Sequence, residues 1–187
     1  HSLAQVARGV RPPIGTSLEI LRQVASGLAA IHAMGILHRD LSLGNIMVNS
    51  SGTAKILDLG LAKDTRRLSQ STQTMLVGTI LYVSPEQADG KPATVRSEIF
   101  SFGVILYELL AGENPFQAEH FTAVLFNIAN RDPVPIEERI QHCPPALVEL
   151  VRTCLAKRPE DRPESMVEVE RRIAEILGAP GLDGASR

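Results

Sequence analysis

One short polar segment of this 187-residue chain combines residue types that can support phosphoryl transfer. His38, Arg39, Asp40 and Leu41 are consecutive, and Asn45 lies five positions after Asp40. A carboxylate on a short loop can orient a substrate hydroxyl and accept its proton, which suits Asp40 to the role of a general base. A nearby amide oxygen can ligate the Mg²⁺ that neutralises a transferring phosphoryl group, which suits Asn45 to metal binding. The alternative is a turn whose polar side chains only satisfy the local backbone.

Asp58 is a second acidic residue that could ligate a metal ion. Asp58 is followed by Leu59 and Gly60, and the triplet comes directly after a short apolar run. An Asp at the end of a strand next to a Gly is anionic and locally flexible, as a ligand for Mg²⁺ bridging two phosphates should be. On its own such a triplet is usually a simple turn.

The elements around these residues are predicted from the apolar pattern. Two short apolar runs, 46–48 and 55–57, flank the turn residues 50–52, which predicts a β-hairpin between Asn45 and Asp58. Before the polar segment, Thr16 and Glu19 form a capping box that predicts a helix from about Ser17 to Met34. Gly35 can take the left-handed conformation that ends this helix.

The rest of the chain is predicted to be mostly helical. Helical spacing of apolar residues predicts a central helix over about 95–110, and further helices near 118–130, 146–155 and 165–177. Residues 60–82 are rich in Ser, Thr and charge, which predicts a long loop. The fold class is therefore mainly α with a small β-hairpin (α+β). We expect one folded unit over residues 1–177, and a flexible tail over residues 178–187.

Composition excludes several classes of protein. The chain is 44% hydrophobic and 21% charged with a net charge of −2, which is typical of a globular domain. It has no Lys/Arg-rich block, so neither nucleic acid nor an anionic membrane is expected as a partner. Its longest apolar stretch, around 103–107, is far shorter than the ~20 residues that span a bilayer. Cys143 and Cys154 form neither a zinc pattern nor a disulfide framework, so a reducing, cytoplasmic location is expected.

Taken together, these residues resemble a protein kinase. His38-Arg39-Asp40-Leu41 with Asn45 resembles the kinase catalytic loop, and Asp58-Leu59-Gly60 resembles the metal-binding triplet. Ser84-Pro85-Glu86 and the run from Gly112 to Phe116 resemble the end of the activation segment and the turn after the central helix. The resemblance is to the C-terminal lobe of a Ser/Thr protein kinase catalytic domain, and it implies ATP and Mg²⁺ as cofactors and a protein substrate.

The resemblance also implies roles for residues outside the two polar motifs. Thr79 would lie under the substrate hydroxyl, and His38 and Arg39 would have structural roles. Glu86 would form a buried ion pair with Arg162, late in the sequence. The candidate phosphorylation sites of the activation loop are Ser69, Ser71, Thr72 and Thr74, whose phosphates could pair with Arg39. The alternative for these four residues is an ordinary solvated loop.

Three features depart from the kinase pattern. Residues 1–37 contain neither the glycine-rich loop nor the strand Lys that hold the ATP phosphates, so we expect the N-terminal lobe to be missing from this segment. Ser42 replaces the usual Lys that contacts the transferring phosphate, and Leu43 replaces the usual Pro. Glu98 stands where the family has an Asp that braces the catalytic loop, and its extra methylene is expected to misplace Asp40.

The sequence leaves three functions open. The first is part of a Ser/Thr protein kinase that transfers the γ-phosphate of ATP to protein Ser/Thr hydroxyls, and is inactive as an isolated lobe. The second is a pseudokinase or truncated kinase lobe acting as a protein-binding module, which Ser42 and Glu98 favour. The third is a small-molecule phosphotransferase, which has no need of the Glu86 and Arg162 arrangement. An isolated lobe is also expected to expose apolar residues of the hairpin, among them Ile46, Met47 and Leu57.

Overall fold

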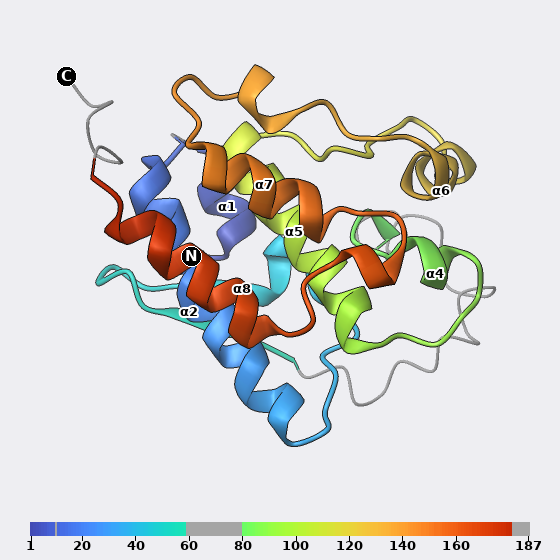
Figure 1. Cartoon of the computed structure of the whole chain (residues 1–187), viewed down its shortest axis with the longest axis horizontal. Coiled ribbons are helices and arrows are strands. Elements are labelled where there is room, and N and C mark those ends of the chain that lie inside the picture. The colour runs from blue at the N-terminus through green and yellow to red at the C-terminus, as the bar shows by residue number, and fades with distance from the viewer. Residues whose placement is uncertain (10, 59–79, 181–187) are drawn as a thin grey trace.

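The computed structural model describes residues 1–9, 11–58 and 80–180, and within these ranges it is mainly helical with one small antiparallel sheet (Figure 1). The predicted fold class is confirmed. In chain order the helices are α1 (Leu3–Arg8), α2 (Ile14–Ala33), α4 (Pro85–Ala88), α5 (Val95–Ala111), α6 (Phe121–Asn130), α7 (Pro145–Cys154) and α8 (Met166–Gly178). Short 3-10 turns lie at Leu43–Asn45 (η1), Ile136–Glu138 (η3) and Pro159–Asp161 (η4), and the strands are β1 (Ile46–Val48) and β2 (Ala54–Ile56).

Helix α5 runs through the middle of the molecule and is buried along almost its whole length (Figure 1). Thr94 caps its start by accepting a hydrogen bond from the Ser97 amide, and Gly112 ends it in the left-handed conformation at φ 79°. On the side facing α7, a Cβ added to Gly103 would lie only 2.8 Å from the Cys154 Cβ atom. The glycine therefore lets the two helices approach closely.

Helix α2 begins earlier than its sequence pattern predicts. Its first residue is Ile14, and Pro13 precedes it with φ −51° and no side-chain cap. The predicted capping box of Thr16 and Glu19 is therefore wrong, because Pro13 sets the start of the helix and both residues fall inside it. Glu19 instead forms an ion pair of 2.8 Å with Arg22, and the helix ends before Gly35, which has φ 72°.

The hairpin forms where it was predicted, with its second strand one residue earlier. Ile46 pairs with Ile56, and the side chain of Asn49 builds the turn by accepting hydrogen bonds from the backbone of Ser51 and Thr53. Burial alternates along β1, so Ile46 is fully buried and its expected exposure is wrong. Met47 and Leu57 are 36% and 41% exposed.

The C-terminal helices close the fold around α5. Helix α8 lies beside α2, although the two are far apart in the sequence (Figure 1). Helix α6 starts at Phe121 rather than near residue 118, since His120 before it has an extended backbone. The predicted loop over 60–82 lies mostly outside the described residues, and at its end Ile80 and Tyr82 are buried.

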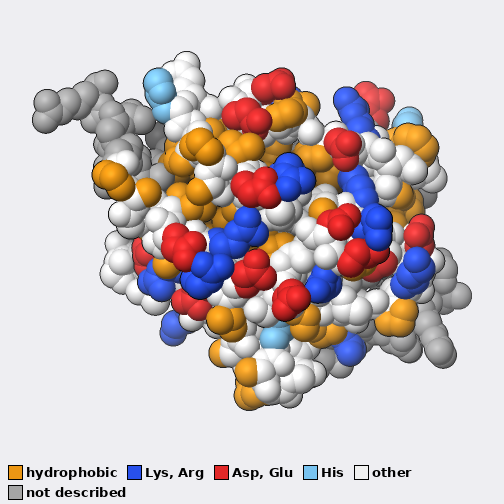
Figure 2. Space-filling view, viewed as in Figure 1, with side chains coloured by type: hydrophobic (Ala, Val, Ile, Leu, Met, Phe, Trp, Pro, Cys, Tyr) orange, Lys and Arg blue, Asp and Glu red, His pale blue; other side chains and the backbone are white. Residues whose placement is uncertain are grey.

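The surface carries charges of both signs. On the face in view, acidic and basic side chains are interspersed rather than gathered into one block (Figure 2). Among the described residues, no helix is both long enough and apolar enough to cross a membrane.

Candidate active site

His38 joins the polar segment to the end of the hairpin. Its side chain is fully buried, with Nε2 lying 2.8 Å from the Leu57 carbonyl oxygen. A carbonyl only accepts, so Nε2 carries the hydrogen and Nδ1 is free to accept a bond of 3.3 Å from the Asp40 amide. His38 is thereby assigned a neutral tautomer, and it links Asp40 to the backbone just before Asp58.

Arg39 has an unusual backbone conformation that Glu98 stabilises. Its φ is 63°, in the left-handed region that residues with a Cβ rarely occupy. The Arg39 amide donates a hydrogen bond of 2.6 Å to Oε1 of Glu98, which projects from the first turn of α5. The extra methylene of Glu98 is thus accommodated, with its carboxylate in contact with the catalytic loop.

Asp40 and Asn45 form the centre of the site. Asn45 donates through Nδ2 to the Asp40 carbonyl oxygen at 2.7 Å and to Asp40 Oδ2 at 3.1 Å. Since the amide nitrogen is engaged by Asp40, the Asn45 Oδ1 atom is the one left to ligate a cation. Both side chains are half-buried, so they are held in place and remain accessible.

Asp58 lies at the same end of the hairpin. The Leu57 amide donates to the Asn45 carbonyl oxygen at 2.8 Å, which brings the next residue, Asp58, close to Asn45. Asp58 is exposed and has φ 52°. In the described ranges no three His, Cys, Asp or Glu side chains gather into a metal site. A pair of oxygen ligands still fits Mg²⁺, which is commonly held by one or two protein ligands together with substrate phosphates and water.

Ser42 and Leu43 begin the turn η1 between Asp40 and Asn45. The Asn45 amide donates to the Ser42 carbonyl oxygen at 3.1 Å, and the Ser42 side chain makes no capping bond. Leu43 is 2% exposed and packs in the core, so the turn forms without the proline typical of the family. The Ser42 hydroxyl carries no charge for a transferring phosphate.

A small cavity opens beside Asp40, between the catalytic loop and helices α4 and α5. Its lining residues are Arg39, Asp40, Leu41, Tyr82, Val83, Gln87, Ala93, Glu98 and Ser101. Burial raises the pKa of Tyr82 far above its ordinary value, so the phenol stays protonated and donates to Glu108 Oε2 at 2.9 Å. The cavity therefore has a largely apolar wall next to the candidate base.

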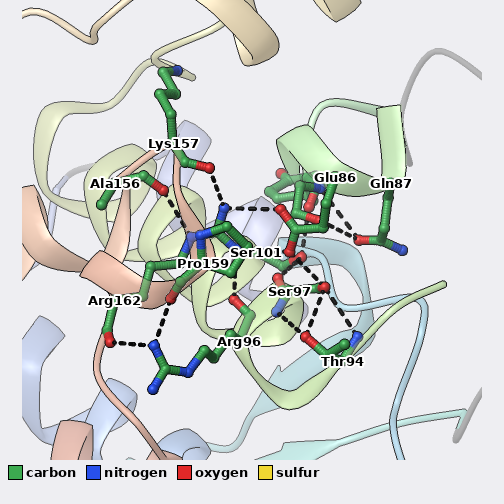
Figure 3. Close-up of polar contacts among 12 residues, drawn as sticks. Glu86, Gln87, Thr94, Arg96, Ser97, Ser101, Ala156, Lys157, Pro159 and Arg162 are labelled. Atoms are coloured by element: carbon green, nitrogen blue, oxygen red, sulfur yellow. Dashed lines mark hydrogen bonds and ion pairs between the residues drawn. The ribbon is translucent and has the colours of Figure 1, made fainter. Parts of the chain in front are cut away.

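Glu86 and Arg162 meet in the interior, near the start of α5 (Figure 3). Their two parallel hydrogen bonds measure 2.8 and 2.9 Å, and Ser97 Oγ donates to Glu86 Oε1 at 2.7 Å. Arg162 also donates to the carbonyl oxygens of Ala156, Arg96 and Lys157. Burial by itself raises the pKa of Glu86, but the bonds from Arg162 and Ser97 outweigh it and hold the pKa below its ordinary value.

Five residues named from the sequence cannot be compared with the site, because Thr79 and the candidate phosphorylation sites Ser69, Ser71, Thr72 and Thr74 lie outside the described residues.

Two residues that sequence reasoning missed have buried polar contacts. His32 meets Glu98 at 2.6 Å, and Lys157 donates to the Ile128 carbonyl oxygen at 2.8 Å. Neither has a local sequence signal, since both partners are distant in the chain.

Comparisons with known proteins agree with this geometry. Residues 8–173 match the protein kinase domain. A probable serine/threonine-protein kinase of Corynebacterium efficiens is 37% identical over 177 residues, which cover 90% of this chain and 26% of that protein. The serine/threonine-protein kinases PknB of Mycobacterium leprae and PknL of Mycobacterium tuberculosis are each 34% identical, covering 90% and 94% of this chain, and 27% and 44% of their own lengths. The chain thus spans less than half the length of these relatives.

The matched region contains the catalytic-loop residues, Asp58, and both members of the Glu86–Arg162 ion pair. The resemblance stated from the sequence motifs is thereby confirmed. This chain belongs to the protein kinase family, and the relatives described above are serine/threonine kinases.

Proposed function

We propose that this chain is the catalytic-loop part of a Ser/Thr protein kinase that transfers the γ-phosphate of ATP to a protein hydroxyl. The observation that carries the proposal is the pair of hydrogen bonds from Asn45 Nδ2 to Asp40. This arrangement fixes a carboxylate for proton transfer next to an amide oxygen for a cation. A protein substrate and a cytoplasmic location belong to the same proposal, and the free thiols of Cys143 and Cys154 support a reducing compartment.

Each residue then has a defined task. Asp40 orients the substrate hydroxyl and accepts its proton as the oxygen attacks the γ-phosphorus atom, while the bond to the leaving ADP oxygen breaks. Asn45 and Asp58 are the residues that would hold Mg²⁺, which neutralises charge on the phosphates when bound. His38 and the Arg39 amide keep Asp40 aimed at the hydroxyl, through the contacts to Leu57 and Glu98.

The ATP phosphates need further contacts that these 187 residues do not supply. Residues 1–37 carry no glycine-rich loop and no strand Lys, and a kinase uses both to cover and hold the phosphates. We therefore expect the 187-residue chain by itself to transfer no measurable phosphate. The full-length protein is the form in which to test activity.

The test is the substitution Asp40→Asn in the full-length protein, assayed with labelled ATP and a Ser/Thr peptide library. Loss of a general base costs about 10²- to 10⁴-fold in rate, so we expect kcat to fall within that range. The matched control is Asp89→Asn, because Asp89 is an exposed carboxylate with only a loose 4.0 Å contact to Lys91. An active D40N variant would contradict the proposal.

A second function, a protein-binding module without chemistry, is favoured by Ser42. An uncharged hydroxyl at this position weakens stabilisation of the transferring phosphate. The same assay separates the two functions, since a binding module transfers no phosphate in its wild-type form. Transfer to a small-molecule acceptor instead of peptides would identify the third function, a small-molecule phosphotransferase.

A further inference from the structure

His32 lies in the last turn of α2 and reaches Glu98, 66 positions later, at the start of α5. Its side chain is only 8% exposed, and Nε2 lies 2.6 Å from Glu98 Oε2, so the imidazole donates to the carboxylate. Neither His32 nor Glu98 belongs to the catalytic-loop motif or to the two residues proposed to hold Mg²⁺, Asn45 and Asp58. A buried polar contact of this length needs an explanation in terms of what it holds in place.

Glu98 uses its two oxygens for two different partners. Oε2 meets His32, and Oε1 accepts the 2.6 Å bond from the Arg39 amide. In the described part of the chain, the hydrogen bonds to this carboxylate come from these two residues. With one oxygen held by His32, the carboxylate has a single orientation for the Arg39 amide. Without His32 it is free to rotate about its last bond.

The start of α5 favours this pairing. His32 lies in the last turn of α2, and Glu98 lies in the first turn of α5, where a partial positive charge favours an anion. Glu98 is 3% exposed, so an unpaired carboxylate there would be costly.

The contacts from His32 to Glu98 and from Glu98 to the Arg39 amide lead to the candidate base, Asp40. Arg39 holds the left-handed conformation at φ 63°, and Asp40 is the next residue. A backbone that is strained at Arg39 persists only when its surroundings fix it. The Glu98 contact is the hydrogen bond that fixes the Arg39 amide. A change at His32 should therefore alter the direction of the Asp40 side chain.

We propose that His32 is a positioning residue for the catalytic loop. It holds the Glu98 carboxylate in the orientation that fixes the Arg39 amide, and through that amide it aims Asp40. The catalytic consequence rests on the proposed kinase function, whereas the structural consequence does not.

The first measurement is independent of activity. Amide hydrogen exchange at Arg39 is followed in the full-length protein by mass spectrometry with fragmentation to single residues. His32→Asn should raise the exchange rate about tenfold or more, because the Asn amide lies near the Nδ1 position and falls short of Glu98. His32→Gln places an amide donor near the Nε2 position and should leave the rate close to wild type. His120→Gln is the control, because His120 is exposed and makes no side-chain cap to α6.

The second measurement separates positioning from general stability. At a temperature well below the melting temperatures of both variants, H32N should lower kcat about tenfold with an unchanged KM for ATP, and H32Q should restore kcat. Unchanged Arg39 exchange in H32N would overturn the proposal, as would equal kcat values in H32N and H32Q when the wild-type protein is active. If wild-type protein transfers no phosphate but H32N still raises Arg39 exchange, the positioning role stands and the kinase function fails.

Discussion

Glu86 and Arg162 lie 76 positions apart in the sequence and form a two-pronged ion pair in which the Arg162 side chain is fully buried and the Glu86 side chain is 9% exposed. The pair ties the short helix α4 to the segment before α8, next to the start of α5 (Figure 3). Because both charges are removed from water, each depends on the other for compensation. The contact is therefore a structural bond between distant parts of the lobe.

Replacing Arg162 with Met should destabilise the protein by about 3–5 kcal/mol, because it leaves the Glu86 carboxylate buried without its partner. The measurement is the free energy of unfolding from urea titration at pH 7. Arg158→Met is the matched control, because Arg158 pairs with Glu160 on the surface, where solvent screens the charges and such pairs contribute little to stability. Equal losses in R162M and R158M would contradict this account.

The Glu86 carboxylate makes the stability of the protein depend on pH in the acid range. Its folded-state pKa lies below the ordinary value, so the folded protein binds fewer protons than the unfolded chain as the pH falls. The stabilisation is complete above the ordinary Glu pKa of 4.5 and is lost as the pH falls through the lower folded-state pKa. Glu86→Gln should flatten the acid side of the curve of unfolding free energy against pH. An unchanged slope in E86Q would count against the pair as its source.

Lys157 should make stability depend on pH on the alkaline side. Its ammonium lies 4.2 Å from the centre of the Phe116 ring and donates to the Ile128 carbonyl oxygen, and burial lowers its pKa from 10.5 to about 8. Between these values the unfolded chain binds more protons than the folded protein, so stability rises with pH. Lys157→Met removes this rise.

The measurement is the difference in unfolding free energy between wild type and K157M at pH 7.5 and pH 10. We expect the difference to change by on the order of 1 kcal/mol in favour of wild type at the higher pH, since partial exposure of Lys157 screens the effect. Lys91→Met is the control, because Lys91 is exposed. A difference that stays constant across this range would show that the Lys157 amine titrates alike in both states.

Gly103→Ala should destabilise the protein by about 1–3 kcal/mol, because the added methyl would press on Cys154 and Leu155 in a packed interior. Gly178→Ala is the control, since Gly178 ends α8 with no atom within 4 Å of an added Cβ. At position 178, Ala gives the unfolded chain less backbone entropy than Gly does, so the stability should be unchanged or slightly higher. The two melting temperatures should therefore move in opposite directions or by clearly different amounts.

On the proposed kinase function, Ser42→Lys should raise kcat of the full-length protein by about ten- to a hundredfold, since a cation aimed at developing charge contributes about 3 kcal/mol in many enzymes. The control is Ser51→Lys, which adds the same charge in the exposed turn of the hairpin, away from Asp40. A lack of gain in S42K would indicate that another cation already serves the transferring phosphate.

Local sequence patterns anticipated much of the fold. The central helix α5 was predicted because its apolar face and the glycine that follows its end, Gly112, are both encoded within one stretch of sequence, and the structure adds the cap by Thr94. The hairpin was predicted from two apolar runs and a turn. The start of α2 was not predicted correctly. Both Pro13 and the capping pattern of Thr16 and Glu19 can mark the start of a helix, and the sequence pattern does not say which of the two prevails.

The sequence by itself determined which groups are available for chemistry, because the carboxylates of Asp40 and Asp58 and the amide of Asn45 are given by residue type. Only the tertiary structure decided how that chemistry is held. His32 meets Glu98, and Glu86 meets Arg162, across 66 and 76 positions, and no local pattern encodes such contacts. They arise when α2, α4 and the η4 segment come together beside α5, because burial of apolar surface brings distant segments together and buried polar groups must then find partners.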